Sequence, residues 1–313
     1  MESQYLQWDI ETIELKLKYA WKISRNTSFT KQNLIIYLDN QAVGEAAPNV
    51  RWGETIEKIA REFESIRSRL PKKKCDLPSF SKSIQNLAIS NSLKCALDMA
   101  CASSFLLKKG ECDTSYSLPI LDINEYEEFI FDNQLSRFKT LKIKLDNNLI
   151  SERISKVKQF FSGDLFVDFN EAFLNYEEIK PHVQTLNENI KLVEQPFREG
   201  SFLDNKKLKN ELICDLFLDE DITDKDILPD MGQYCDGVNV KIQKAGGPSR
   251  AAQLLAQAKN QKLKTMVGCM VETSLGISHS MRLNNVDFYD LDGSLMILDE
   301  PFSLCFEKNG VLH

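Results

Sequence analysis

The sequence lacks the features that mark nucleic-acid-binding, secreted and membrane proteins. Basic residues are in the minority, since 39 Lys and Arg stand against 46 Asp and Glu, whereas a protein that follows a phosphate backbone carries the opposite charge. Residues 1–11 lack the basic start and the apolar stretch of a secretory signal. The most apolar helical stretch, residues 93–107, contains Lys94 and Asp98 and is too short for a bilayer. We therefore expect neither nucleic acid nor a membrane as a partner.

Cysteine and histidine are present without the spacing that would give them a role. The sequence has no C-x-x-C pair, and its eight cysteines are scattered, unlike those of a small disulfide scaffold. Reduced thiols and a cytoplasmic location are therefore expected. The three histidines, His182, His279 and His313, are dispersed and none follows a predicted strand, so histidine catalysis is not expected.

What is present is a globular composition, with 42% apolar and 27% charged residues over 313 positions. The first part reads as α+β. Residues 15–23 alternate apolar and polar side chains, and residues 33–38 form a second strand before the turn at Asp39 and Asn40. Residues 56–66 and 93–107 repeat apolar side chains at helical spacing. We predict a small antiparallel sheet with helices over residues 1–111.

From residue 112 the pattern changes to short β-rich runs separated by helix-length polar segments. Eight such runs occur, at residues 115–120, 141–145, 165–169, 191–195, 216–220, 237–242, 265–270 and 287–292. Polar residues at their ends recur at the interval of one strand, one helix and two loops. The fold class predicted is α/β: a (β/α)8 barrel over 112–298 with an N-terminal α+β capping domain, 1–111. Residues 299–313 are too short for a domain and are expected to pack back on the capping domain.

Carboxylates stand at the ends of three consecutive predicted strands. In a barrel of this kind the carboxyl ends of the strands build the active site, so Asp168, Glu194 and Asp219 should converge. Like charges in a half-buried cluster repel unless a cation lies among them, and oxygen ligands select a hard divalent ion, Mg²⁺ first. Separate surface carboxylates or structural ion pairs remain the alternative.

Lysines flank these carboxylates in the predicted barrel. Lys142 and Lys144 are two residues apart on one strand, so both side chains point inward, and Lys241 ends a strand roughly across the barrel. An ammonium beside another cation loses part of its preference for the charged form, and its pKa falls toward the range of a general base. Two opposed lysines suit removal of a proton from one face of a carbon and its return to the other. Singly, each lysine could also be a solvated side chain.

Taken together, the segments that carry these residues resemble the enolase superfamily. Within it they resemble the muconate-lactonizing subgroup and the dipeptide epimerases of that subgroup. The matching segments are KIK (142–144), VDFN (167–170), VEQP (193–196), LDE (218–220), NVKIQKAGG (239–247), VGCMVETSLG (267–276), GEAAPNVRWGET (44–55) and ALDMA (96–100). The resemblance implies that Asp168, Glu194 and Asp219 bind one Mg²⁺ per subunit. It also implies that Lys144 and Lys241 are the acid/base pair and that Lys142 tunes Lys144.

The predicted substrate-binding residues lie at the last strands and in the capping loops. Asp290 and Asp292 share one face of the last strand, and a D-x-D here resembles the dipeptide epimerases, where the pair holds the free α-amino group. Asp292 could instead cap a helix, with Asp290 structural. An arginine of the first capping loop pairs with the glutamate side chain in relatives acting on Ala-Glu, which makes Arg25 a candidate. The further candidates are Trp52, its neighbour Arg51, Cys269 and Met270.

The predicted activity is 1,1-proton transfer at the α-carbon of the C-terminal residue of a dipeptide, through an enediolate that Mg²⁺ stabilises. Acidic, hydrophobic and other second residues stay open, with an inclination to Ala-Glu. The alternatives within the subgroup are o-succinylbenzoate synthase, N-acylamino acid racemase and cycloisomerase. A catalytically silent binding protein is the alternative from another class. Metabolism of peptidoglycan peptides or of other dipeptides, and a homo-oligomer, are compatible with the resemblance.

Overall fold

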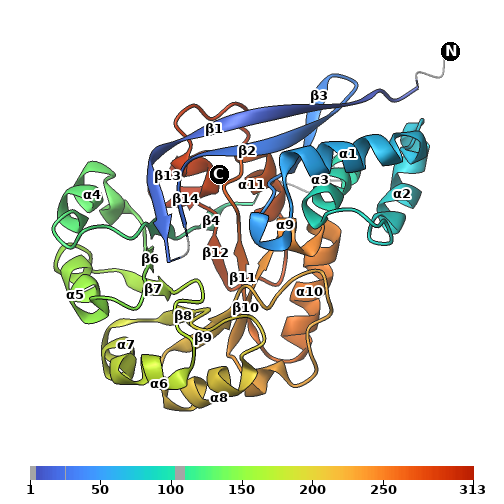
Figure 1. Cartoon of the computed structure of the whole chain (residues 1–313). Coiled ribbons are helices and arrows are strands. Elements are labelled where there is room, and N and C mark those ends of the chain that lie inside the picture. Colours follow the sequence, from blue (N-terminus) through green and yellow to red (C-terminus); the bar gives the residue numbers. More distant parts are fainter. Residues whose placement is uncertain (1–4, 25, 103–109) are drawn as a thin grey trace.

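The N-terminal part is a three-stranded antiparallel sheet covered by helices, and the rest of the chain is built on a ring of parallel strands (Figure 1). The structure is a computed structural model that describes residues 5–24, 26–102 and 110–313. The strands of the first sheet, in the order β1-β2-β3, are β1 (Trp8–Ile23), β2 (Asn26–Leu38) and β3 (Gln41–Ala46). In the described part of the chain no helix combines the length and the apolar character needed to cross a bilayer.

The turn and the helices of this part follow from local sequence. Asp39 and Asn40 join β2 to β3 with φ angles of 52° and 65°, a left-handed conformation that these short polar residues tolerate. Thr55 caps helix α1 by accepting a hydrogen bond from the Lys58 amide. The helices are α1 (Ile56–Ile66), α2 (Leu77–Ile84) and α3 (Asn91–Ala102). Helix α2 was not predicted. The predicted helix of residues 93–107 corresponds to α3 as far as Ala102, and its remaining residues lie outside the described part of the chain.

The eight predicted barrel strands are all present and all parallel. They are β5 (Tyr116–Leu118), β6 (Thr140–Lys144), β7 (Asp164–Asp168), β8 (Leu192–Glu194), β9 (Asp215–Leu218), β10 (Gly237–Lys241), β11 (Lys264–Gly268) and β12 (Phe288–Asp290), each paired with its neighbour along the chain. Thr114 bridges Tyr289, and the Ser115 amide donates to the Tyr289 carbonyl at 3.0 Å. These contacts bring the first and last strands together, and the predicted fold class is confirmed.

Helices follow the strands of the ring. They are α4 (Tyr126–Asp132), α5 (Ile150–Phe160), α6 (Tyr176–Ile179), α7 (Val183–Asn189), α8 (Phe202–Glu211), α9 (Ile242–Ala245), α10 (Pro248–Asn260) and α11 (Ser274–Ser280). Between β9 and β10 the described chain has only a 3-10 helix, Met231–Gln233, since Pro229 and the left-handed Asp230 interrupt an α-helix there. A second 3-10 helix, Gly293–Met296, follows β12.

The C-terminal segment adds a small sheet of its own. Strands β13 (Glu307–Lys308) and β14 (Val311–Leu312) form a small antiparallel sheet with β4 (Cys112–Asp113), next to the start of the barrel. Arg137 of the barrel binds Glu307 at 2.9 Å, and Ser274 donates to Glu300. Strand β4 offers the segment a strand edge to pair with, and His313 also lies 3.1 Å from Glu111, at the end of the predicted capping domain. The domain boundaries themselves stay predictions.

The long β1–β2 hairpin reaches over the carboxyl ends of the barrel strands. The Leu298 amide donates to the Lys16 carbonyl, and the Ile120 amide donates to the Lys22 carbonyl, both at 2.9 Å. Near the hairpin tip the Ser24 hydroxyl donates to the Asn170 carbonyl at 2.9 Å, just beyond β7. The N-terminal part therefore forms one wall of the space above the barrel.

Candidate active site

Three buried carboxylates lie at the ends of neighbouring barrel strands. Asp168 is the last residue of β7 and is paired in register with Glu194, the last residue of β8. Asp219 follows β9 directly. All three side chains are buried, with exposed fractions of 0%, 0% and 3%. The predicted convergence of these strand ends is what the parallel register produces.

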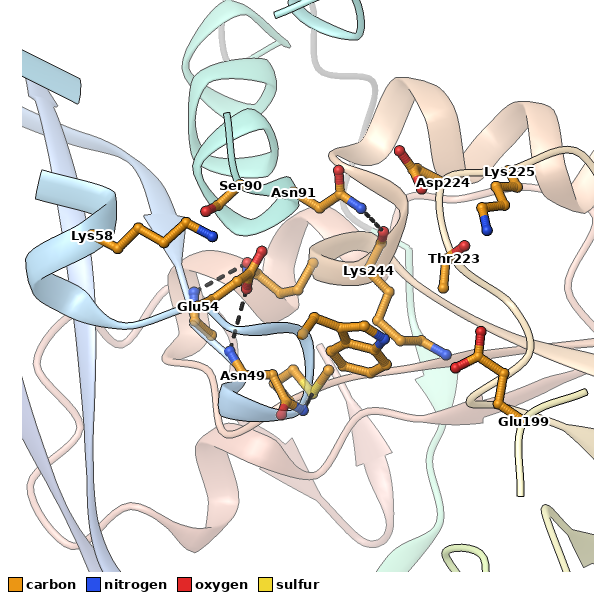
Figure 2. A pocket seen from close by; sticks show the side chains of 14 residues that line it. Asn49, Glu54, Lys58, Ser90, Asn91, Glu199, Thr223, Asp224, Lys225 and Lys244 are labelled. Atoms are coloured by element: carbon orange, nitrogen blue, oxygen red, sulfur yellow. Dashed lines mark hydrogen bonds between the residues drawn. The ribbon is translucent and has the colours of Figure 1, made fainter. Parts of the chain in front are cut away.

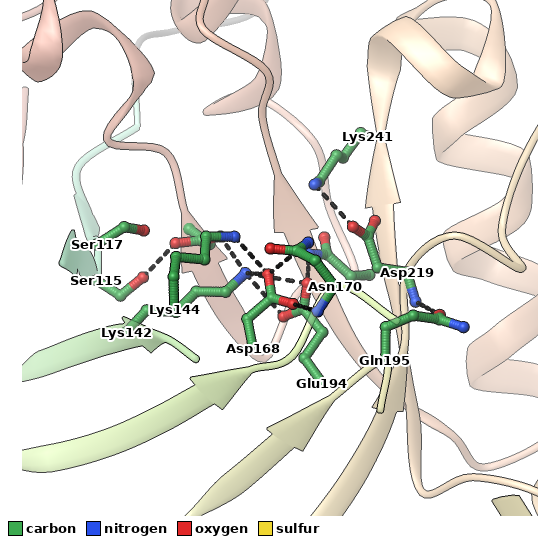
Figure 3. A network of polar contacts seen from close by, with 12 residues as sticks. Ser115, Ser117, Lys142, Lys144, Asp168, Asn170, Glu194, Gln195, Asp219 and Lys241 are labelled. Carbon is green, nitrogen blue, oxygen red and sulfur yellow. Dashed lines mark hydrogen bonds and ion pairs between the residues drawn. The ribbon is translucent and has the colours of Figure 1, made fainter. Parts of the chain in front are cut away.

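Each carboxylate contacts at least one lysine (Figure 3). Lys142 Nζ lies 3.2 Å from Asp168 Oδ2, 2.8 Å from Glu194 Oε2 and 2.8 Å from Asp290 Oδ2. Lys144 lies two residues after Lys142 on the same face of β6, and its Nζ binds Asp168. Lys241 Nζ lies 2.9 Å from Asp219 Oδ2, and Figure 3 shows it on the other side of the carboxylates from Lys144. The two predicted acid/base lysines therefore approach the cluster from opposite sides.

These contacts set the ionisation of the site. Burial alone would lower the pKa of Lys142, but Asp290, Glu194 and Asp168 outweigh burial and raise it. In the same way Asp219 raises the pKa of Lys241 against its burial. In Lys142 and Lys241 the contact with carboxylates therefore acts on the pKa against the lowering expected from burial and from neighbouring ammonium groups.

The same pairs act on the acids. Burial would raise the pKa of Asp168 and of Asp219, but the adjacent lysines hold both well below the usual range. Burial raises the pKa of Glu194, and Lys142 does not fully offset it. A cluster of this kind keeps its acids ionised only as long as cations stay in contact with them.

Two residues that hold Asp219 were not among the predicted site residues. Lys244, on the short helix α9, is buried and binds both the carboxylate and the main-chain carbonyl of Asp219. Gln195 Oε1 accepts hydrogen bonds from the amides of Asp219 at 2.7 Å and Glu220 at 2.9 Å. The spacing of Lys244, three residues after Lys241, is the signal that could have indicated a shared face of one helical turn.

The donor set fits a hard divalent cation such as Mg²⁺. Asp168, Glu194 and Asp219 offer only oxygen, and the three buried acids need positive charge among them. The Asn170 amide nitrogen lies 3.3 Å from Asp168 Oδ2, while its buried Oδ1 has no hydrogen-bond partner in the described chain. As they stand, no three His, Cys, Asp or Glu side chains of the described residues surround one point closely enough for a metal. The lysines take up the carboxylate oxygens instead, so an ion would have to replace ammonium contacts.

The two predicted ammonium ligands are Asp290, which ends β12, and Asp292, two residues beyond it, and their pKa values are shifted in opposite directions. Asp290 accepts hydrogen bonds from Lys142 and from the Ser115 hydroxyl at 2.6 Å, and although burial opposes this, Lys142 lowers its pKa. Asp292 accepts one from the Ser117 amide at 2.6 Å. Burial and the nearby Asp290 raise the pKa of Asp292 to about 7. Ser115 and Ser117 alternate on β5 and its approach, a period-2 signal that sequence reasoning did not use.

The space above the carboxylates is a cavity of about 630 Å³ between the hairpin and the barrel, which we call the mouth cavity. The predicted residues that line it are Trp52, Lys144, Asp219, Lys241, Cys269, Met270, Asp290 and Asp292. Arg25 lies outside the described residues. Arg51 also lines the cavity, but its guanidinium is bound to Glu171, at 2.6 Å from each oxygen, and to Glu199 at 3.4 Å. Its charge is therefore already neutralised within the chain.

A smaller side pocket of about 310 Å³ adjoins the mouth cavity and shares Trp52 and Met270 with it. Figure 2 shows Lys58, Glu54 and Asn49 on one side of this pocket and Lys244 on the other. The Asn91 amide donates to the Lys244 carbonyl at 3.0 Å, and the Asn49 amide donates to Glu54 at 3.3 Å. The capping loops and helix α9 thus meet behind the site.

This barrel with lysines on strands two and six and acids on strands three to five defines the class of the protein. The family described as Enolase C-terminal domain-like matches residues 127–292, more than half of the chain. The chain belongs to this family and, through it, to the enolase superfamily.

Relatives and solved structures agree with that assignment. The L-Ala-D/L-amino acid epimerase of Maribacter sp. is 26% identical, over 93% of this chain and 91% of its own length. The L-Ala-D/L-Glu epimerase of Escherichia coli is 28% identical over 93% and 94%. These names place the chain among the isomerases. It contains Lys144, Asp168, Glu194, Asp219 and Lys241 at the strand ends described above.

Two solved structures have the same fold. The substrate-liganded L-Ala-D/L-Glu epimerase of Bacillus subtilis has a TM-score of 0.86 at 23% identity, covering 99% of this chain and 96% of its own. A dipeptide epimerase from Methylococcus capsulatus, complexed with Mg and L-Arg-D-Lys, has a TM-score of 0.87 at 20% identity over 99% and 97%. At this identity the likeness concerns the fold.

Proposed function

We propose that this protein is a Mg²⁺-dependent dipeptide epimerase that inverts the α-carbon of the C-terminal residue. The observation that carries the proposal is the placement of Lys144 and Lys241 on opposite sides of three buried carboxylates. The names of the relatives support the reaction type and the dipeptide as substrate.

The two lysines exchange a proton with the substrate. In one direction an unprotonated Lys144 or Lys241 takes the α-proton, so the C–H bond breaks and its electron pair moves toward the substrate carboxylate. The opposite lysine, protonated, donates its proton to the other face of the same carbon. The reaction therefore leaves the substrate inverted and the proton shifted from one lysine to the other. Positioned acid/base groups of this kind accelerate a reaction by about 100-fold to 10,000-fold.

Asp168, Glu194 and Asp219 would hold one Mg²⁺ per subunit. When bound, the ion would stabilise the second negative charge that develops on the substrate carboxylate as the α-proton leaves. Lys144 and Lys241 now rest on Asp168 and Asp219, so loss of these contacts would release both ammonium groups toward the mouth cavity. Lys142, which contacts three acids and is fully buried, stays in place as a fixed positive charge that keeps them ionised.

The remaining predicted residues orient the dipeptide. Asp290 and Asp292 present two carboxyl groups to the mouth cavity and suit the free α-amino group. Trp52, Cys269 and Met270 line the same cavity and would contact the rest of the substrate. The β1–β2 hairpin, tied to the barrel through Lys16 and Lys22, would limit access of water to the site.

The test is deuterium incorporation from deuterated water. A library of dipeptides is incubated with the protein and Mg²⁺, and mass gain and diastereomer formation are followed. We expect one-deuteron gain at the α-carbon of the C-terminal residue for at least one dipeptide, and loss of this gain when a chelator removes the metal. If no dipeptide in a broad library gains deuterium, the proposal is wrong. The Asp292→Ala variant distinguishes the epimerase from a dehydrating or cycloisomerising enzyme. Only the epimerase should lose substrate binding in this variant, because the substrates of the other enzymes have no ammonium group.

A further inference from the structure

We propose that Lys31 selects the charge of the substrate's second side chain and binds a carboxylate of that side chain. This inference rests on the proposed function and names the substrate class: dipeptides with an acidic C-terminal residue. Lys31 lies on strand β2 of the capping sheet and lines the mouth cavity together with Lys144 and Lys241 of the barrel. It was not among the residues predicted from the sequence.

The register of β2 turns Lys31 toward the barrel. Two residues further on, Asn33 donates a hydrogen bond across to the Val271 carbonyl, beyond β11, at 2.9 Å. Side chains two residues apart on a strand share a face, so Lys31 projects from the same face as Asn33. Trp21, Ile23 and Ser28 of the same hairpin line the cavity beside it. The Lys31 side chain therefore belongs to the wall of the mouth cavity.

Of the basic side chains that line the cavity in the described chain, Lys31 differs from the others because it forms no ion pair. Four basic residues of the described chain line it. Three of them are bound to acids: Arg51 to Glu171, Lys144 to Asp168, and Lys241 to Asp219. Lys31 forms no ion pair within the described chain, and its pKa is lowered by burial with no carboxylate to oppose the shift. A half-buried cation in a cavity without a counter-charge is a site for an anion that comes from outside the chain.

The position separates this site from the groups that bind the rest of the substrate. Asp290, the last residue of β12, and Asp292, two residues beyond it, line the cavity from the barrel, and so does Asp219, one of the predicted metal ligands. Lys31 lines the same cavity from strand β2 of the capping sheet. The substrate α-amino group and α-carboxylate are accounted for on the barrel, which leaves the side chain of the second residue for Lys31. A basic side chain at that place would meet an unpaired ammonium and be rejected.

The experiment compares matched dipeptides on matched variants. Wild-type protein, Lys31→Met and Lys31→Glu are assayed by α-deuterium incorporation with L-Ala-L-Glu, L-Ala-L-Gln and L-Ala-L-Lys. Because Glu and Gln have the same shape, their ratio of kcat/KM isolates the charge. Lys22→Glu is the control, since Lys22 is an exposed lysine on the same hairpin and does not line the cavity. Unfolding midpoints establish that each variant is folded.

We expect wild-type protein to prefer Ala-Glu, and Lys31→Met to lower kcat/KM for Ala-Glu by roughly 10-fold to 100-fold, the usual size of a lost hydrogen bond to a charged group. Ala-Gln should change little. Lys31→Glu should raise the rate with Ala-Lys, whereas Lys22→Glu should leave all three rates near wild type. An unchanged Glu-to-Gln ratio in Lys31→Met overturns the inference while dipeptide exchange itself upholds the proposed function. Absence of exchange with every dipeptide overturns both.

Discussion

Two groups of buried carboxyl side chains in this molecule have opposite electrostatic surroundings. In the barrel, Asp168 and Asp219 contact lysine ammonium groups, which lower the pKa of both acids against their burial. Between the capping sheet and the barrel, Glu45 of β3 and Glu272 after β11 are equally buried, yet burial raises the pKa of both. Burial is the same in the two groups, so the partners decide the charge.

The partners of the second group are neutral. Glu45 accepts hydrogen bonds from the Asn33 amide at 2.7 Å, the Thr273 amide and hydroxyl, and the Gly276 amide. Glu272 accepts one from Gln243 at 2.9 Å and one from the Met270 amide at 2.9 Å. A Cβ atom on Gly276 would lie 2.4 Å from Glu272 Oε2 and 3.0 Å from Glu45 Oε2, so only glycine leaves room there. This group joins the two parts of the chain, whereas the lysine-paired acids are suited to exchange one cation for another.

Asp219→Asn should have the largest effect on stability. The amide keeps the shape but removes the counter-charge of Lys241 and Lys244, both buried. Removing one partner of a buried ion pair costs about 3 to 5 kcal/mol. We expect the free energy of unfolding, measured in urea without added metal, to fall by that amount. The control is Asp132→Asn at an exposed position, and a loss no greater than that of the control would contradict the ion-pair account.

At pH 6.5 Glu272→Gln should have a smaller effect on stability than Asp219→Asn, and of opposite sign. The pKa of Glu272 is raised from 4.5 to about 8 in the folded chain, so between these values the folded state holds a proton that the unfolded state has lost. Wild-type stability from this group is therefore complete below pH 4.5 and falls as pH rises to about 8, by up to about 1.4 kcal/mol per pH unit. The glutamine variant, which resembles the protonated acid, should lose this decline.

Urea unfolding at pH 5, 6.5 and 8 measures the difference between these slopes. Glu128→Gln, an exposed change, is the control and should keep the wild-type slope. An equal decline in wild type and Glu272→Gln would show that Glu272 is ionised throughout, like the acids of the barrel.

Asp292→Asn should have the smallest effect, on the pH dependence of catalysis. Lys142 lowers the pKa of Asp290, but burial and Asp290 raise the pKa of Asp292 to about 7, against the hydrogen bonding of Ser117. A dipeptide ammonium needs the ionised form, so wild-type kcat/KM should rise about tenfold from pH 6 to pH 8. The asparagine variant should be flatter, and a rise of the same size in both would assign the titration to another group.

The barrel and its strand-end residues could be predicted because the signal is local and repeated. Asp168 and Glu194 end apolar strands and Asp219 follows one, and parallel strands place such residues at one edge of the barrel. The same argument gave Lys144 and Lys241. It could not give their protonation states, which depend on contacts between strands.

The rest of the site depends on residues that are far apart in the sequence or lie in irregular segments. Lys244 lies on a helix of one turn that reads as a loop. Glu45 and Thr273 meet across 228 positions, so no window of sequence contains both. Lys31 could be recognised only from the ion pairs of the other basic side chains that line the cavity. The sequence does not show which face of the hairpin a lysine occupies, because successive side chains of a strand point to opposite faces.

The central claim is that two lysines act on opposite faces of one carbon, and proton exchange in single-lysine variants tests it most directly. Purified L,L and L,D isomers of an accepted dipeptide are incubated in deuterated water with Lys144→Ala or Lys241→Ala, and the α-proton signal is followed by NMR. We expect both variants to lose interconversion of the isomers by at least about 100-fold, and each to exchange the α-proton of one isomer only, a different one for each variant. Full interconversion in either variant, or exchange of the same isomer by both, would contradict the account.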